Sequence, residues 1–255
     1  MPIAASMYYA AYEGGRKDCA PVILIHGAGS SHLVWPVEMR RINGCRVYAV
    51  DLPTHGRSPG IAVRNISQYC QHLLNFFHAN DIYQAVLVGH SLGGAIALQT
   101  AIDHPENVAG LGLISSAAYF SLPLRLIEMV KRGTSSPEIG QMLRADAFAL
   151  NTTDEIKDLA LAPFQKVRSS VLQADWEICQ RFNVRSQLQD IQCPVWLAVG
   201  EEDRMVPPLS VRDTANLLPH ATMQQIDQAG HMLMLEKPAA LADGLKRFLQ
   251  TNHWY

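Results

Sequence analysis

Short, almost wholly apolar runs alternate along this chain with segments in which apolar residues recur every three or four positions. The runs with hardly any polar residue lie at positions 22–26, 47–51, 85–89, 111–115 and 195–200. Strands of this kind must be covered on both faces, and the periodic segments between them predict the helices that cover them. We therefore expect an α/β protein built on a mostly parallel, twisted sheet flanked by helices.

Two further strands have a different pattern. Residues 222–228 alternate between apolar and polar side chains, which is typical of a strand near a sheet edge. Residues 7–12 predict an antiparallel strand at the start of the chain. Asn65 stands where a helix that begins at the next residue needs an N-cap. Helical periodicity is clear in three segments of this part of the chain: 66–79, 92–104 and 239–249.

The alternation of strands and helices stops between residues 117 and 192. This stretch has helical patterns and no clear strand; the patterns lie at 122–132, 137–150, 153–161 and 163–182. The simplest explanation is a helical insertion between two consecutive strands, because a strand pattern resumes at residue 195. We expect a core domain formed by residues 1–116 and 193–255, and a helical domain formed by residues 117–192.

One polar residue stands in an unusual place after the third apolar run. The sequence Gly89-His90-Ser91-Leu92-Gly93 joins a predicted strand to a predicted helix, and a simple turn needs the glycines but not the serine. Glycine on both sides permits a strained turn, because a Cβ atom at either position would clash. Such a turn lifts the Ser91 hydroxyl above the sheet at a helix N-terminus, where a nucleophile is exposed and negative charge is favoured.

A serine hydroxyl is a weak nucleophile by itself and needs a general base, which is in turn oriented by an acid. The loop after the fifth apolar run has three candidate acids, Glu201, Glu202 and Asp203, and the loop after the alternating strand has His231. These positions follow the carboxyl ends of strands, where open α/β sheets place their active sites. The order serine, acid, histidine is that of one known fold.

The chain resembles the α/β-hydrolase superfamily, and in particular its carboxylesterase-like members with a helical cap. The segments that carry the resemblance span most of the chain: ILIHGAGSS, DLPTHGRS, GHSLGG, GEEDRMVP and AGHMLMLEKP. The resemblance implies a sheet of about eight strands, with the cap inserted between strands 6 and 7. It also implies that Ser91 is the nucleophile, that His231 is the general base, and that Asp203, rather than either glutamate, orients the imidazole.

Stabilisation of a developing oxyanion needs two backbone N–H groups. One is expected from Leu92, which directly follows the candidate nucleophile at the start of the helix. The resemblance to the family's H-G-x loop implies that Ala28 supplies the other. Three apolar side chains are candidates for the substrate pocket, although a role in core packing suits them equally: Trp35, Val206 and Met232.

Composition narrows the range of partners. The 255 residues carry a formal net charge of −2 without a basic or acidic block, so nothing indicates a nucleic-acid or anionic-membrane partner. No apolar stretch approaches the roughly 20 residues of a membrane span, and the first residues lack a signal-peptide pattern. The five cysteines are scattered and no residues have metal-ligand spacing. We therefore expect free thiols, a cytoplasmic protein, and no metal or other cofactor, whereas the oligomeric state is not indicated.

The most direct functional expectation is a carboxylesterase-type serine hydrolase that cleaves small, largely neutral esters through an acyl-enzyme intermediate. The apolar cap and the lack of a positive cluster favour this substrate class, although the fold by itself decides little. An enol-lactonase or a C–C bond hydrolase of the same fold is the alternative among enzymes. A small-ligand receptor that retains the three site residues is a more distant alternative, which repeated turnover of an ester excludes.

Overall fold

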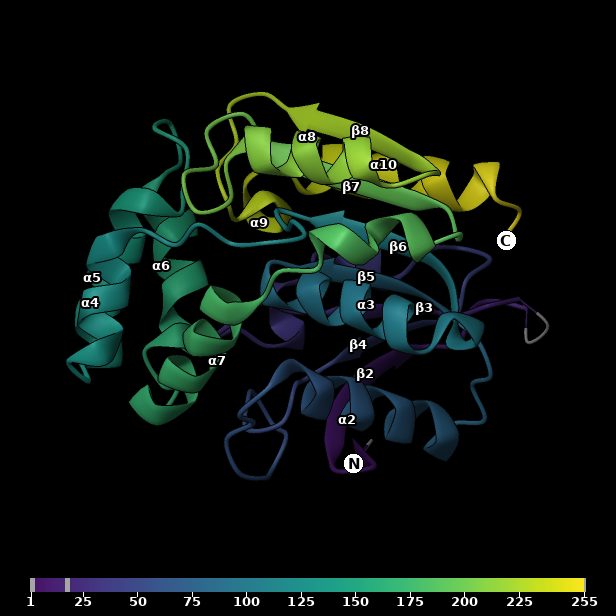
Figure 1. Ribbon diagram of the computed structural model, residues 1–255, viewed down its shortest axis with the longest axis horizontal. Coiled ribbons are helices and arrows are strands. Elements are labelled where there is room, and N and C mark those ends of the chain that lie inside the picture. The colour runs from purple at the N-terminus through teal and green to yellow at the C-terminus, as the bar shows by residue number, and fades with distance from the viewer. Residues whose placement is uncertain (1–2, 17–18, 255) are drawn as a thin grey trace.

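The computed structural model describes residues 3–16 and 19–254, which form one eight-stranded sheet with helices around it (Figure 1). Residues 1, 2, 17, 18 and 255, which the sequence analysis assigns to the core domain, lie outside the described residues. The strands are β1 (Ile3–Ala4), β2 (Met7–Tyr12), β3 (Val22–Ile25), β4 (Val47–Val50), β5 (Ala85–His90), β6 (Val108–Ile114), β7 (Val195–Gly200) and β8 (Ala221–Ile226). Their order across the sheet is β1-β2-β4-β3-β5-β6-β7-β8.

Most neighbouring strands of the sheet are parallel. All pairs from β4 to β8 run in the same direction, whereas β2 is antiparallel to β4 and β1 is antiparallel to β2. The predicted mostly parallel sheet of about eight strands is confirmed. Strand β8 lies at an edge, as its alternating pattern predicts. Strand β1 was not predicted, because two residues are too short to show a period.

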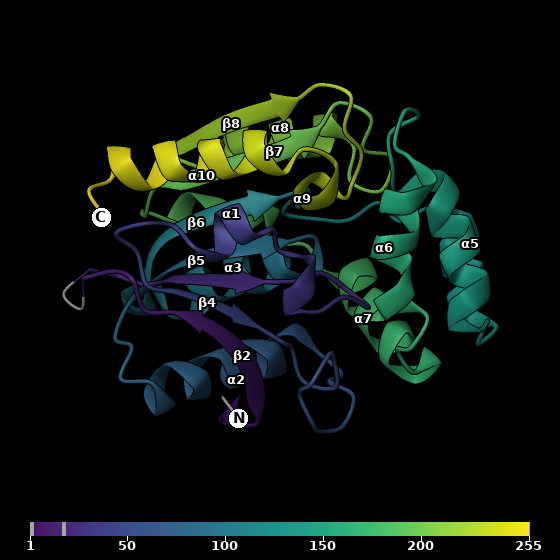
Figure 2. The same ribbon diagram turned by 180° about the vertical axis from the view of Figure 1, so that it is seen from behind.

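Side chains of the central strands alternate between two apolar cores, one on each face of the sheet. In β3, Ile23 and Ile25 belong to the first core, and Val22 and Leu24 belong to the second. The helices that cover the first face are α2 (Ile66–Ala79), α3 (Leu92–Asp103) and α8 (Pro208–Leu217) (Figure 1). Those that cover the second face are α1 (Val37–Arg40), α9 (Leu233–Glu236) and α10 (Pro238–Thr251) (Figure 2). Burial on both faces explains why these strands are almost wholly apolar.

The core helices agree closely with the sequence periodicity. Helix α2 spans the predicted range, and the Asn65 side chain caps it by accepting the N–H of Gln68 at 3.0 Å. Helix α3 ends at Asp103, one residue before the predicted end, and a 3₁₀ turn (Pro105–Asn107) follows it. Proline cannot continue the ladder of hydrogen bonds, which accounts for this end.

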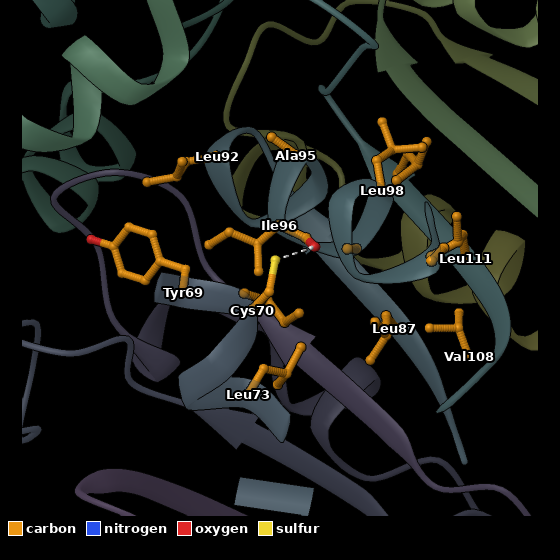
Figure 3. Packing of buried hydrophobic residues seen from close by; sticks show 14 of the residues in the cluster. Tyr69, Cys70, Leu73, Leu87, Leu92, Ala95, Ile96, Leu98, Val108 and Leu111 are labelled. Atoms are coloured by element: carbon orange, nitrogen blue, oxygen red, sulfur yellow. Dashed lines mark hydrogen bonds between the residues drawn. The ribbon is translucent and has the colours of Figure 1, made fainter. Parts of the chain in front are cut away.

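Helix α3 packs firmly between α2 and the sheet. Leu92, Ile96 and Leu98 of α3 belong to a cluster with Cys70 of α2 and side chains of β5 and β6 (Figure 3). The Cys70 thiol donates to the carbonyl oxygen of Ile96 at 3.7 Å. Truncation of a buried side chain such as Ile96 to alanine costs about 2–5 kcal/mol in a core of this kind. The start of α3 therefore has a defined position, directly after Ser91.

Four helices between β6 and β7 form a separate layer beyond one end of the sheet (Figures 1 and 2). They are α4 (Leu124–Lys131), α5 (Ser136–Asp146), α6 (Asp154–Phe164) and α7 (Ser169–Arg181), and we call them the helical insertion. Their apolar faces form a third core, which includes Leu126, Leu143, Phe164 and Leu172. The proposed domain limits, residues 117–192, remain a prediction.

Helices α6, α7 and α8 differ from the predicted pattern, and a proline is involved in each case. The pattern places Pro163 at the start of a helix, but it lies in the last turn of α6, and α7 begins only at Ser169. A proline marks a break without showing on which side the break falls. Helix α8 was not predicted, because Pro207 and Pro208 together resemble a loop, although proline also fits the first turn of a helix. The short helices α1 and α9 were not predicted either, because four residues hardly show a period.

Candidate active site

Ser91 lies in a strained turn between β5 and α3. Its backbone has φ 51° and ψ −117°, a conformation that costs an L-residue about 1–3 kcal/mol. A Cβ at Gly89 would lie 2.2 Å from the carbonyl carbon of Gly93, and a Cβ at Gly93 would lie 2.1 Å from the carbonyl oxygen of Ile25. Only glycine fits at both positions, so strand and helix come close enough to impose the turn.

The segment at the end of β6 holds this turn in place. The N–H of Ser91 donates to the carbonyl oxygen of Ile114 at 3.0 Å, and the Ser116 hydroxyl donates to the carbonyl oxygen of Ser91 at 2.8 Å. These bonds satisfy both backbone groups of the strained residue, which offsets part of the cost of its conformation. The turn therefore depends on tertiary structure and not only on its own sequence.

Asp203 and His231 lie side by side, although 28 residues separate them in the chain. Their loops follow β7 and β8, which are parallel neighbours, so both loops leave the same edge of the sheet. The Nδ1 atom of His231 lies 3.0 Å from Oδ2 and 3.2 Å from Oδ1 of Asp203. The same Oδ1 accepts the N–H groups of Met205 and Val206, at 2.9 and 2.8 Å. Held in this way, the Asp203 carboxylate is placed to accept from Nδ1–H, and in that tautomer Nε2 of His231 has a lone pair.

The two glutamates beside Asp203 face other partners. Glu202 accepts the N–H of Leu150 at 2.8 Å, and Glu201 lies 3.4 Å from the N–H of Gln228. Of the three candidate acids, the structure brings only Asp203 to His231.

Ser91 and His231 line the same cavity, between the carboxyl edge of the sheet and the helical insertion. Most of its wall is apolar, and the insertion supplies much of that wall through Leu143, Phe148, Leu161, Phe164 and Trp176. Among the described residues that line it, there is no Asp, Glu, Lys or Arg. Such a cavity suits an uncharged ligand, because a buried charge without a partner is costly.

Two of the three predicted pocket residues lie in this wall. Val206 and Met232 line the cavity, next to the acid and the histidine respectively. Trp35 does not: it is 1% exposed and packs in the core on the α1 and α10 face, with Val34 and Met39. It directly follows a 3₁₀ turn (His32–Val34), and its indole fills this core and not the pocket.

The structure places the two predicted oxyanion donors on either side of this region. Ala28 follows β3 and lines the cavity, and Leu92 is the first residue of α3. Within the part of the chain that is described, neither N–H has a hydrogen-bond acceptor. Free N–H groups at such positions can receive a negatively charged oxygen, and the helix N-terminus at Leu92 adds a favourable dipole.

Two neutral histidines support the loops around the cavity. Nε2 of His26 accepts the N–H of Leu52 at 3.0 Å, and its Nδ1 donates to the carbonyl oxygen of Gly27. Burial lowers the pKa of His26 to about 4. His90 donates from Nε2 to the carbonyl oxygen of His231 at 3.0 Å, and burial holds its pKa well below the usual value. Neither ring takes up a proton near neutral pH, which suits a structural role.

Asp175 of α7 is a buried charged group that sequence reasoning missed. Its Oδ1 accepts the Tyr69 hydroxyl at 2.6 Å, and its Oδ2 lies 2.9 Å from Nε2 of His55. Nδ1 of His55 donates to the carbonyl oxygen of Pro53 at 3.0 Å, and Nε2 faces Asp175 together with the more distant N–H of Gly29, at 3.3 Å. Burial lowers the pKa of His55, but the Asp175 carboxylate outweighs burial and the pKa is raised. A buried ion pair therefore joins the helical insertion to the core; an aspartate among apolar positions was its only signal in the sequence.

The described residues also limit other kinds of site. None of their His, Cys, Asp and Glu side chains gather in groups of three or more as a metal ion would require. No helix among them is both long and apolar enough to span a bilayer. All five cysteines are unpaired in the structure.

Comparison with known proteins places the chain in a family. The model of the alpha/beta hydrolase family matches residues 22–244. The magnesium-chelatase 30 kDa subunit of Rhodobacter capsulatus is 30% identical over 260 residues, which cover 91% of this chain and 86% of that protein. The pimeloyl-[acyl-carrier protein] methyl ester esterase of Salmonella agona (strain SL483) is 28% identical over 253 residues, which cover 91% and 94%. A thermophilic esterase from Thermogutta terrifontis has a similar fold, with a TM-score of 0.86, 22% identity, and 97% and 94% of the two chains covered. This protein belongs to the alpha/beta hydrolase family.

Proposed function

We propose that the protein is a serine hydrolase that cleaves small, uncharged carboxylic esters through an acyl-enzyme intermediate. The observation that carries the proposal is the strained Ser91 in the wall of an apolar cavity, with His231 in the same wall and held by Asp203. Strain at this serine is explained if its hydroxyl must be presented as a nucleophile.

In the proposed mechanism, Nε2 of His231 takes the Ser91 proton as the serine oxygen attacks the acyl carbon of the ester. The negative charge that forms on the carbonyl oxygen is stabilised by the N–H groups of Ala28 and Leu92. The tetrahedral intermediate then collapses, the bond to the alcohol breaks, and His231 gives its proton to the leaving alcohol. Asp203 remains ionised and stabilises the imidazolium form of His231 throughout.

Water completes the cycle by the same route. His231 removes a proton from water as the water oxygen attacks the acyl carbon, and the second tetrahedral intermediate expels the Ser91 oxygen. The carboxylic acid leaves, and the proton returns from His231 to Ser91. No metal or organic cofactor takes part in this proposal.

The proposed substrate class rests on the cavity wall. Its apolar side chains and the lack of charged groups among its described residues favour an uncharged acyl chain. A relative that is 28% identical is named a methyl ester esterase, which supports an ester as the reactive group. We place the protein in the cytoplasm, since five unpaired cysteines suit a reducing compartment, and we assign it neither a nucleic-acid nor a membrane partner.

A hydrolysis panel of p-nitrophenyl esters, methyl esters, thioesters and lactones tests the proposal. We expect many turnovers on uncharged esters and slow reaction of esters that carry a free carboxylate. Ser91→Ala is expected to leave only about 10³–10⁴-fold acceleration over water, whereas the exposed Ser186→Ala control keeps full activity. A fluorophosphonate probe is expected to add its mass to the peptide that contains Ser91.

The outcomes separate the alternatives. Hydrolysis confined to lactones favours the enol-lactonase, and one acylation without turnover favours a receptor. Full activity of Ser91→Ala means that the nucleophile lies elsewhere, which refutes the proposal.

A further inference from the structure

The loop between β8 and α9, residues 227–232, carries His231, and we call it the histidine loop. A carboxylate that does not line the cavity, that of Glu236, binds this loop on both sides of His231. Oε1 of Glu236 accepts the N–H groups of Gly230 and Met232, both at 3.1 Å. These are the residues immediately before and after His231, so one carboxylate holds the backbone on both sides of the imidazole. Hydrogen bonds to a charged acceptor are roughly twice as strong as neutral ones, which makes this a firm attachment.

The second oxygen of Glu236 extends the attachment to the helical insertion. Oε2 accepts the N–H of Ala149 at 2.9 Å and the hydroxyl of Thr152 at 2.6 Å. The N–H of His231 itself donates to the carbonyl oxygen of Ala147 at 3.0 Å. All three partners lie in residues 145–152, which comprise the last two residues of α5 and most of its connection to α6 and which we call the brace.

The loop between β7 and α8, residues 201–207, carries Asp203, and we call it the acid loop. It also contacts the brace. Glu202 accepts the N–H of Leu150 at 2.8 Å, and the Arg204 guanidinium donates to the carbonyl oxygens of Ala145 and Phe148. Glu202 and Arg204 are the two neighbours of Asp203 in the chain. The brace therefore contacts the residues that flank both the acid and the histidine.

Close packing leaves little freedom in this contact. A Cβ at Gly230 would lie 2.6 Å from the carbonyl carbon of Phe148 and 2.7 Å from the nitrogen of Ala149, so the histidine loop and the brace touch backbone to backbone. Phe148 is 1% exposed and its side chain forms part of the cavity wall. The brace is thus a rigid link between the cavity wall and the two loops that carry Asp203 and His231.

We propose that Glu236 is a positioning residue for His231, which it holds against the brace through the backbone on either side. This inference rests on the proposed function, in which His231 is the general base. Glu236 does not line the cavity, so its loss acts mainly on the alignment of the imidazole and reaches the cavity wall only through the brace. Poor alignment of a catalytic group lowers kcat, and a displacement of about 1 Å is sufficient for a loss of about 100-fold.

Steady-state ester hydrolysis and fluorophosphonate labelling test the proposal on the full chain, well below its melting temperature. We expect Glu236→Ala to lower kcat and the labelling rate of Ser91 by about 100-fold with little change in KM. Glu236→Gln is expected to fall between this variant and the wild type, because one of the two acceptor oxygens becomes an NH₂ group, which cannot accept from the backbone N–H groups that face it. Glu128→Ala on the exposed surface of α4 is the matched control and should keep wild-type kcat.

A double variant separates positioning from general stability. If Glu236 acts only by aligning His231, the variant with both Glu236→Ala and His231→Ala is no slower than His231→Ala alone, since groups that act as a unit are not additive. A further loss of about 100-fold in the double variant, or wild-type kcat in a folded Glu236→Ala, overturns the inference. If the alanine variant does not fold, Glu236→Gln takes its place in the same cycle, with the same two outcomes.

Failure of this inference is distinguishable from failure of the proposed function. If His231→Ala alone keeps wild-type activity, the histidine is not the base and the proposed function fails. If His231→Ala is inactive while folded Glu236→Ala is fully active, only the positioning role fails.

Discussion

We predict that the buried ion pair of His55 and Asp175 stabilises the folded protein, and two substitutions of Asp175 test this prediction. Asp175→Ala removes the carboxylate and leaves Nε2 of His55 and the Tyr69 hydroxyl without their shared partner, at a site with no exposed surface. Asp175→Asn removes the charge but keeps the shape. Its amide oxygen can accept from Tyr69, and its NH₂ group can donate to Nε2 of a neutral His55, whose Nδ1 still donates to Pro53.

The magnitude follows from the burial of the pair. Loss of one partner from a buried ion pair costs about 3–5 kcal/mol, and a chain of this size loses roughly 2–4 °C in melting temperature for each kcal/mol. We therefore expect Asp175→Ala to lower the Tm by roughly 6–20 °C at pH 6, and Asp175→Asn to lower it much less. Asp154→Asn is the matched control: its pair with Arg144 is 2.9 Å long but exposed, so its loss costs at most about 1 kcal/mol.

The raised pKa of His55 gives the sign of the pH dependence. A group with a higher pKa in the folded state stabilises that state fully below its unfolded pKa of about 6.5, and this contribution is lost as the pH rises through the folded pKa. Asp51 and His26 also face the His55 ring, but Asp175→Asn leaves both unchanged. The wild type should lose stability toward alkaline pH, and the Asn variant should lose less.

Urea unfolding followed by circular dichroism between about pH 6 and 9.5 measures this difference. The reasoning is refuted if the wild type and Asp175→Asn have the same pH dependence. It is equally refuted if Asp175→Ala is no more damaging than the exposed control.

Three further predictions concern the site and its support. Asp203→Asn should lower kcat for a p-nitrophenyl ester by about 10³–10⁴-fold, since an amide favours the wrong tautomer of the histidine, and a loss below tenfold contradicts its role. Gly93→Ala should lower the Tm, because its Cβ meets backbone at 2.1 Å. Gly140→Ala, with nothing closer than 3.9 Å, should raise the Tm, because alanine favours a helix over glycine by about 1 kcal/mol. Trp176→Ala should shift kcat/KM toward longer acyl chains, while Trp35→Phe should leave the preference unchanged; equal shifts in both contradict the cavity assignment.

The sequence predicts those parts of the molecule whose structure depends mainly on residues that are close together in the chain. Strands β3 to β7 are apolar because both faces are covered, and this requirement is visible in each run by itself. The turn at Ser91 is indicated by Gly89 and Gly93, four residues apart, although the backbone that a Cβ at Gly93 would meet belongs to Ile25, far away in the chain. A single aromatic residue is different: Trp35 is recognisably buried, but its sequence does not show on which side of the sheet.

Contacts between the helical insertion and the core could not be predicted from sequence. His55 and Asp175 are 120 residues apart, and Thr152 and Glu236 are 84 residues apart. Pairing of charges over such distances depends on how the insertion docks, which periodicity does not encode. The resemblance to a known family identified the acid, whereas residues that hold the acid and histidine loops required coordinates.

Gly29 has a consequence for the order of events in a catalytic cycle. Side chains of the insertion occupy the space that a side chain at Gly29 would need. A Cβ there would lie 2.5 Å from the Phe164 ring and 2.6 Å from a methyl group of Leu172. The loop that carries Ala28 is thus backed by the same helices that form much of the cavity wall. In the proposed reaction, any outward movement of these helices to admit an ester would also remove this backing from the Ala28 loop.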